Sequence, residues 1–214
     1  MSTKSTLVYS LAVNITVITI KTVAGLLSGS AAMLAEVAHS LVDSLTGPLL
    51  LVGEWHGRSW AKGPRFWGLL AAVNMALMGG GYAAWEGVQS ILDPTVAGGL
   101  LWVSLGVLAI SAALETSSLV RAIRTLAPSR NGRSWWTHLR TTSNNAMKTQ
   151  IIEDGLDVAG CTLAMIGTVA QLVTDSAVWN GAAAVLIAVL LTGAAIELGQ
   201  NNARLLVAPD PCGD

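Results

Sequence analysis

A single apolar stretch, Gly29–Gly53 (GSAAMLAEVAHSLVDSLTGPLLLVG), carries Glu36, His39 and Asp43. His39 and Asp43 stand four residues apart, so on an α-helix their side chains lie on one face, one turn above the other. An imidazole and a carboxylate placed in this way can bind the same small cation. Ionisable side chains inside a membrane span cost about 2.5–3.5 kcal/mol each on insertion scales and mark functional sites by default. This pair is therefore the first candidate for a metal site.

A second polar group lies in KTQIIEDGLDVAG, near the start of a later apolar run. Gln150 and Asp154 repeat the four-residue spacing of the first pair, whereas Glu153 pairs by spacing with Asp157 on another helix face. If Asp154 faces the first pair, an imidazole and two carboxylates meet, with Gln150 or Glu153 as fourth ligand and with Asp157 and Glu36 as secondary candidates. Such a set suits zinc, and it tolerates cobalt, nickel, manganese, iron or cadmium. The alternative is a polar network that joins two helices.

The composition predicts an integral membrane protein, because 52% of the 214 residues are hydrophobic and only 12% are charged. The net charge of −1 does not indicate nucleic-acid binding, which usually needs a basic surface. Sequence motifs of enzymes such as G-x-S-x-G, H-E-x-x-H and the P-loop are absent, so we expect no enzyme. Cys161 in an apolar run and Cys212 near the end are expected to be inert thiols.

Runs of about twenty apolar residues, the length that crosses a bilayer core, predict an all-α fold, a six-transmembrane-helix bundle. Eleven of the twelve Lys and Arg residues lie in or beside connections on one side of this topology. The positive-inside rule makes that side cytoplasmic and places both termini there. The predicted spans are Leu7–Leu27, Ala31–Gly53, Phe66–Ile91, Ala97–Val120, Met147–Val173 and Val178–Leu198.

The exception among the basic residues is Lys21, which lies inside the first span. A hairpin after this span brings Lys21 level with Glu36, so we expect a structural ion pair, since buried charges persist when they are paired. Glu86, Glu115 and Glu197 lie within about two turns of predicted span ends, where a side chain reaches the headgroups. None of these three is assigned to the metal site.

The third predicted span contains three consecutive glycines, Gly79–Gly81. Small residues let membrane helices approach one another closely. We expect a packing surface within the chain in the first place. For a homodimer held by transmembrane helices, this span is the leading candidate for the surface.

These residues resemble a known family. GSAAMLAEVAHSLVD resembles the second-span signature of the cation diffusion facilitator family, whose members exchange divalent metal ions for protons. The sequences YAAWEGVQSILDP, LETSSLVRAIR, IIEDGLDVAG and NNARLLV, together with Lys21, are similar to the branch that includes the ninth mammalian zinc transporter. The resemblance implies a usually dimeric six-helix bundle with a tetrahedral site between the second and fifth spans, in which His39, Asp43 and Asp154 match the ligands.

Two features depart from the family pattern. Gln150 is a weak neutral ligand where many members have histidine or aspartate. Members also usually continue into a cytoplasmic α+β domain, whereas here residues 1–208 form the expected transmembrane domain and 209–214 a short tail. We expect a naturally short protein without the cytoplasmic domain, multi-pass in a bacterial cytoplasmic membrane.

The expected function is proton-coupled export of a divalent metal cation, with zinc as the first choice. Metal ligation needs a neutral imidazole and ionised carboxylates, so zinc and protons compete for the site. Two alternatives stay open at this point. One is a metal-selective channel, and the other is a non-transporting partner subunit of a full-length relative.

Overall fold

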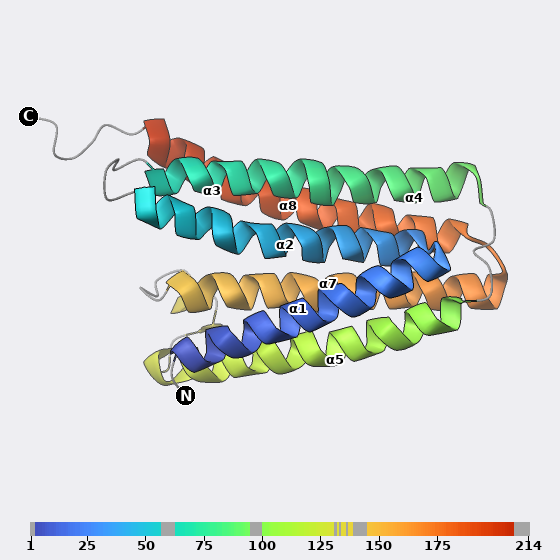
Figure 1. The fold of residues 1–214 in the computed structure, drawn as a ribbon, viewed down its shortest axis with the longest axis horizontal. Helices are drawn as coiled ribbons and strands as arrows, with labels where there is room; N and C mark the ends of the chain where they lie inside the picture. The colour runs from blue at the N-terminus through green and yellow to red at the C-terminus, as the bar shows by residue number, and fades with distance from the viewer. Residues whose placement is uncertain are drawn as a thin grey trace, which may run out of the picture.

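The computed structural model describes residues 3–56, 63–94, 100–130, 132, 134–135, 137–138 and 145–207. Within these ranges the regular structure is entirely helical, as predicted (Figure 1). The elements are α1 (Thr3–Ser28), α2 (Ala31–His56), α3 (Gly63–Asn74), the π-helical η1 (Met75–Gly81), α4 (Tyr82–Leu92), α5 (Leu101–Leu126), the 3-10 turn η2 (Ala127–Arg130), α7 (Asn145–Thr174) and α8 (Val178–Val207).

Six helical rods form the bundle, because α3, η1 and α4 run on from one another as a single rod (Figure 1). Five stretches in the described residues are long and apolar enough to cross a membrane. They correspond to the first, third, fourth, fifth and sixth predicted spans, and α2 corresponds to the second. The five stretches are Val8–Ser28, Arg65–Leu92, Leu101–Arg130, Gln150–Thr174 and Val178–Arg204.

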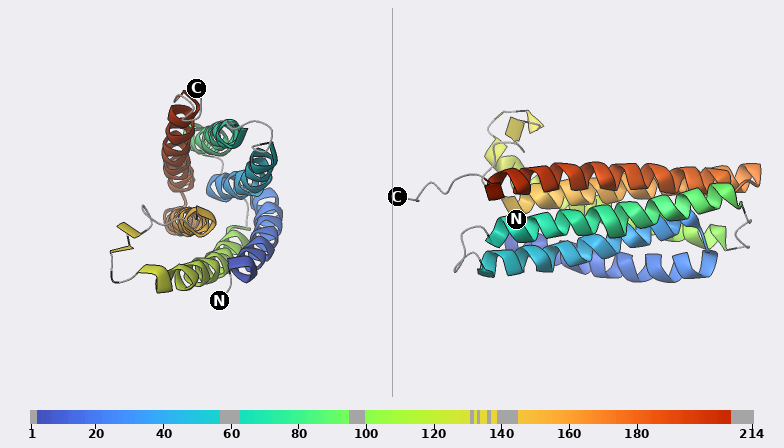
Figure 2. Two further views of the ribbon diagram at one scale, coloured as in Figure 1. Left: turned by 90° about the vertical axis from the view of Figure 1, so that its left-hand side faces the viewer. Right: turned by 90° about the horizontal axis from the view of Figure 1, so that it is seen from above.

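The rods are arranged so that α2 and α7 lie in the middle, between two pairs of rods (Figure 2). Viewed end-on, α8 and the α3–α4 rod lie on one side and α1 and α5 on the other (Figure 2). The tightest core gathers small side chains of α2, α7 and α8, among them Ala32, Ala35, Ala164 and Ala184, each fully buried. Because these side chains are small, the helix backbones come close and bring the polar residues of α2 and α7 within reach of each other.

A tight turn joins α1 to α2. Gly29 has φ +61°, a left-handed conformation that favours glycine. The Oδ1 atom of Asn180, at the start of α8, accepts hydrogen bonds from the Ser30 hydroxyl at 3.0 Å and from the Ala32 N–H at 2.6 Å. Its Nδ2 atom donates to the Thr168 hydroxyl of α7 at 3.5 Å. One buried side chain thus ties together the first turn of α2, α7 and α8.

The glycines of the third rod pack inside the chain. Gly79 faces Leu191 of α8 and Val42 of α2, and a Cβ on Gly80 would overlap the hydroxyl of Thr192 in α8. The packing interpretation of this stretch is confirmed for both glycines. The prediction that Gly80 belongs to a dimer surface is wrong, because α8 of the same chain occupies the space beside it.

The start of α1 and the end of α8 lie at the same end of the bundle (Figure 1). The described arginines gather at this end as well: Arg65 is in the first turn of α3, and Arg124 and Arg204 lie in the last turns of α5 and α8. This distribution agrees with the charge asymmetry of the sequence. The cytoplasmic location of this end stays a prediction.

Candidate metal site between α2 and α7

The site begins with the pair His39 and Asp43 on the inner face of α2. The four-residue spacing places the imidazole Nε2 atom 3.2 Å from the Oδ2 atom of Asp43. The exposed fraction is 2% for the His39 side chain and 6% for that of Asp43. Both residues therefore share one helix face and are withdrawn from solvent, as the spacing predicted.

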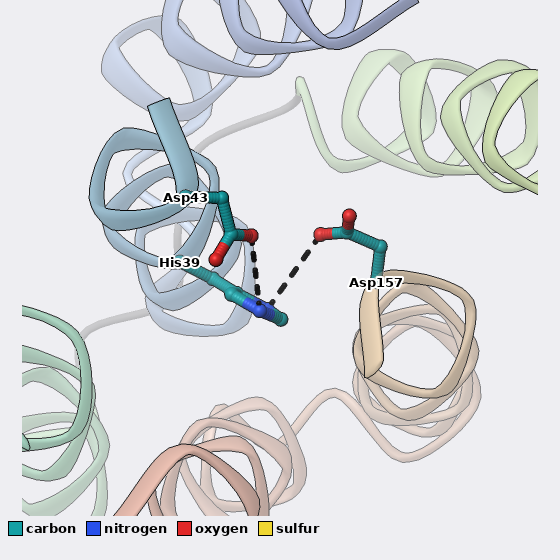
Figure 3. Close-up of side chains that lie close together, drawn as sticks. All are labelled: His39, Asp43 and Asp157. Carbon is teal, nitrogen blue, oxygen red and sulfur yellow. Dashed lines mark ion pairs between the residues drawn. The ribbon is translucent and has the colours of Figure 1, made fainter. Parts of the chain in front are cut away.

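A third side chain, Asp157, reaches this pair from α7 (Figure 3). Its Oδ1 atom lies 3.8 Å from the Nδ1 atom of His39, and its side chain is 6% exposed. One ligand atom each from His39, Asp43 and Asp157 can be chosen so that all three lie within 4.8 Å of one another. Two helices far apart in sequence thus bring together an imidazole and two carboxylates.

One distance in the site is close to an edge of a metal-binding tetrahedron. With metal–ligand bonds of about 2.0–2.2 Å, neighbouring ligand atoms of a tetrahedral zinc site lie about 3.3–3.6 Å apart. The separation of 3.2 Å between Nε2 of His39 and Oδ2 of Asp43 matches one edge. The 3.8 Å to Asp157 starts from the other ring nitrogen, Nδ1, so it is not an edge of the same tetrahedron.

Several atoms of this group are buried without a hydrogen bond from the described residues: both ring nitrogens of His39, both carboxylate oxygens of Asp43 and Oδ1 of Asp157. Buried polar groups are nearly always hydrogen-bonded, and an exception calls for a functional explanation. Ligation of a cation gives one ring nitrogen of His39 and the carboxylate oxygens a partner. The donor set, one nitrogen and two carboxylates, is one that zinc accepts.

Comparison with known proteins identifies the family. Residues 7–207 match the cation efflux transmembrane domain.

The chain belongs to the cation efflux family.

Among its relatives, the proton-coupled zinc antiporter SLC30A9, mitochondrial, of Xenopus laevis is 24% identical over 198 residues, which are 87% of this chain and 35% of that protein. The human protein of the same name gives the same values. Metal tolerance protein C4 of Arabidopsis thaliana is 25% identical over 191 residues, 84% of this chain and 42% of that protein. The cation efflux chain thus spans 35–42% of the length of these curated relatives.

Asp154, the aspartate that the sequence interpretation placed opposite α2, lies elsewhere in this cation efflux protein. It is 1% exposed, and its Oδ1 atom accepts a hydrogen bond of 2.6 Å from Nε2 of Gln150. Three residues turn an α-helix by about 300°, so Asp154 and Asp157 point about 60° apart. That rotation brings Asp157, rather than Asp154 and Gln150, to His39 and Asp43.

Glu153 lies on the same face of α7 as Asp157, one turn earlier. Its side chain is half-buried, and it is not among the three residues whose ligand atoms lie within 4.8 Å of one another. The pair Glu153–Asp157 on α7 therefore repeats the four-residue spacing of the pair His39–Asp43 on α2. This second four-residue spacing was the signal in the sequence that pointed to Asp157.

A second charged cluster adjoins the site. Lys21 Nζ lies 2.9 Å from Oε2 of Glu36, which confirms the predicted ion pair. It also lies 2.8 Å from Oε1 of Glu115, which is 2% exposed. The prediction that Glu115 reaches the headgroups is wrong, because α5 continues to Leu126 and leaves Glu115 eleven residues from its end.

Proposed function

We propose that this chain exchanges a divalent metal cation, zinc in the first place, for protons across a membrane. The observation that carries the proposal is that ligand atoms of His39, Asp43 and Asp157 lie close together between α2 and α7. Glu153 is the proposed fourth ligand, because it lies one turn before Asp157 on the same face of α7. Family membership and the relatives named as zinc antiporters support the proposal.

Zinc is favoured by the nitrogen donor. An imidazole combined with carboxylates is a common zinc ligand set, whereas magnesium and calcium prefer oxygen alone. Cobalt, nickel, manganese, iron and cadmium accept the same ligands with different strengths. We therefore expect zinc to be transported in preference to these other cations.

Coupling to protons follows from the same ligands. Zinc binds His39 as neutral imidazole and the aspartates as carboxylates, so loading the metal releases any protons that these groups carry. Protons that return to the site weaken it for metal. Metal and protons then occupy the site in turn, which is the requirement for antiport.

Transport also requires the site to open. His39, Asp43 and Asp157 are 2–6% exposed in this structure, so an ion enters only when helices around the site move apart. The site lies between two helices rather than within one, which makes a relative movement of α2 and α7 sufficient to open it. Opening first toward one side and then toward the other moves the ion across.

The test uses purified protein in liposomes that contain a zinc-sensitive and a pH-sensitive dye. Wild-type protein should move zinc inward and protons outward in a fixed ratio. Asp157→Asn should abolish both movements. The matched control Asp154→Asn, three residues earlier on α7, should retain zinc binding. Zinc flux without proton movement would indicate a channel and refute antiport, and loss of binding in Asp154→Asn alone would refute the ligand set.

A further inference from the structure

Lys21, Glu36 and Glu115 form a closed cluster beside the metal site. The three side chains come from α1, α2 and α5, and they are 0%, 0% and 2% exposed. One ammonium faces two carboxylates, and it also donates to the Ser40 hydroxyl at 3.3 Å. With both carboxylates ionised the cluster has a net charge of −1, so either carboxylate can be neutralised and still leave one complete ion pair.

Cys161 of α7 closes the cluster from the fourth side. Its Sγ atom lies 3.3 Å from Oε2 of Glu36 and 3.2 Å from Oε2 of Glu115, and it shares its single proton between them. The Oε2 atom of Glu36 therefore contacts both Lys21 and Cys161. The other oxygen, Oε1, is buried and has no hydrogen-bond partner among the described residues.

This free oxygen of Glu36 faces the metal site. It lies 4.0 Å from Nδ1 of His39, which is itself buried without a hydrogen bond in the part of the chain that the structure describes. Gly160 of α7 makes room for it, because a Cβ at that position would overlap Oε1. The carboxylate is thus held by Lys21 on one side and by the backbone of α7 on the other, with one oxygen left for the imidazole.

A histidine that binds a metal through one ring nitrogen commonly donates its other N–H to a carboxylate, which fixes the ring and strengthens the ligand. Nε2 of His39 lies on the side of Asp43, so it is the nitrogen that can share a metal with that carboxylate. Nδ1 then remains as the donor. Two carboxylate oxygens lie near this nitrogen, Oδ1 of Asp157 at 3.8 Å and Oε1 of Glu36 at 4.0 Å. When Asp157 binds the metal, Glu36 is left as the acceptor for Nδ1–H.

We propose that Glu36 is a positioning residue for His39. It accepts the Nδ1–H hydrogen bond when Nε2 binds the metal, and Lys21 and Gly160 hold it in place for this task. Glu115 balances the charge of Lys21, and the ion pairs within the described residues join it to Lys21 rather than to His39. The inference rests on the proposed function, because it assigns a role in binding the same metal.

The cluster supplies a matched pair of variants, Glu36→Gln and Glu115→Gln. Each removes one carboxylate and leaves Lys21 with the other, so both keep a buried neutral ion pair. A third variant, Gly160→Ala, displaces the oxygen of Glu36 without changing any charge. Zinc affinity is measured by titration calorimetry in detergent, and the protonated nitrogen of His39 is identified by NMR of protein with ¹⁵N-labelled histidine.

In the wild type, zinc should bind Nε2 and leave the proton on Nδ1. Glu36→Gln should weaken zinc binding about 10–100-fold, the usual effect of losing such a carboxylate, and should allow a mixture of ring nitrogens at the metal. Gly160→Ala should likewise weaken zinc binding and allow a mixture of ring nitrogens at the metal. Glu115→Gln should keep the wild-type nitrogen and change affinity far less.

Equal losses in Glu36→Gln and Glu115→Gln, or an unchanged ring nitrogen in both Glu36→Gln and Gly160→Ala, would overturn the role of Glu36 while leaving the metal site standing. Wild-type protein in which zinc does not change the signals of His39 would overturn the proposed function itself, and this inference with it. If Glu36→Gln does not fold, Gly160→Ala alone decides between the two results.

Discussion

Replacing Lys21 by methionine should strongly destabilise the fold, because it strands two carboxylates. The ammonium lies 2.9 Å from Glu36 and 2.8 Å from Glu115, and none of the three side chains is more than 2% exposed. Removing one partner of a buried ion pair costs about 3–5 kcal/mol. Since proteins are stable by only about 5–15 kcal/mol, Lys21→Met should lose a large share of the free energy of unfolding.

The variants that restore stability distinguish a three-residue cluster from a simple pair. The double variant Lys21→Met with Glu36→Gln still leaves Glu115 buried and uncompensated, so it should recover only part of the loss. Adding Glu115→Gln removes the last charge, and the triple variant should approach or exceed wild-type stability, because buried ion pairs are often replaceable by uncharged groups.

Stability is measured by titration with SDS in mixed micelles, followed by tryptophan fluorescence. The single variants Glu36→Gln and Glu115→Gln serve as controls and should each cost less than Lys21→Met. Equal stability of the double and triple variants would contradict the participation of Glu115. A loss below about 1 kcal/mol for Lys21→Met would contradict the reasoning as a whole, since exposed ion pairs give losses of that size.

Further predictions concern the site and the packing around it. Glu153→Gln should weaken zinc binding without abolishing it, which calorimetry measures, and unchanged affinity would remove Glu153 from the ligand set. Zinc affinity should fall as pH is lowered from 7.5 to 5.5, by about tenfold per pH unit for each proton displaced, and a flat profile in equilibrium dialysis would exclude proton competition. Gly80→Ala should lower the melting temperature, because its Cβ overlaps the hydroxyl of Thr192, whereas Gly106→Ala, with open space around it, should not lower it; equal melting temperatures would contradict the packing described for Gly80.

Hydropathy was sufficient to predict the helices but not their ends. The predicted spans correspond in order to the six rods, because a bilayer core demands about twenty apolar residues from each. The fourth span was expected to end at Val120, but α5 continues to Leu126, and the sixth was expected to end at Leu198, but α8 continues to Val207. Helices extend beyond the apolar region where polar side chains remain compatible with a helix, and hydropathy does not register those turns.

The spacing of the site residues along each helix was predictable from the sequence, but the face of α7 that points toward α2 was not. Four-residue spacing placed His39 and Asp43 together because it depends only on helix geometry. The choice between Asp154 and Asp157 depends on how α7 is rotated against α2, and packing of small residues against α5 and α8 sets that rotation. The depth of Glu115 was missed for a related reason, since it was judged from a span end that lies further along α5.

The hydrogen bonds of Asn180 anchor one end of α2. They join the first turn of α2 to α7 and α8 at the end opposite to the chain termini. At 1.5 Å per residue, His39 lies about 13 Å from this anchored first turn, and the far end of α2 lies about 38 Å from it. A tilt of about 10° would therefore displace the site by about 2 Å and the far end by about 7 Å. Any tilt of α2 about its Asn180 end thus moves the far end of the helix about three times as far as it moves His39.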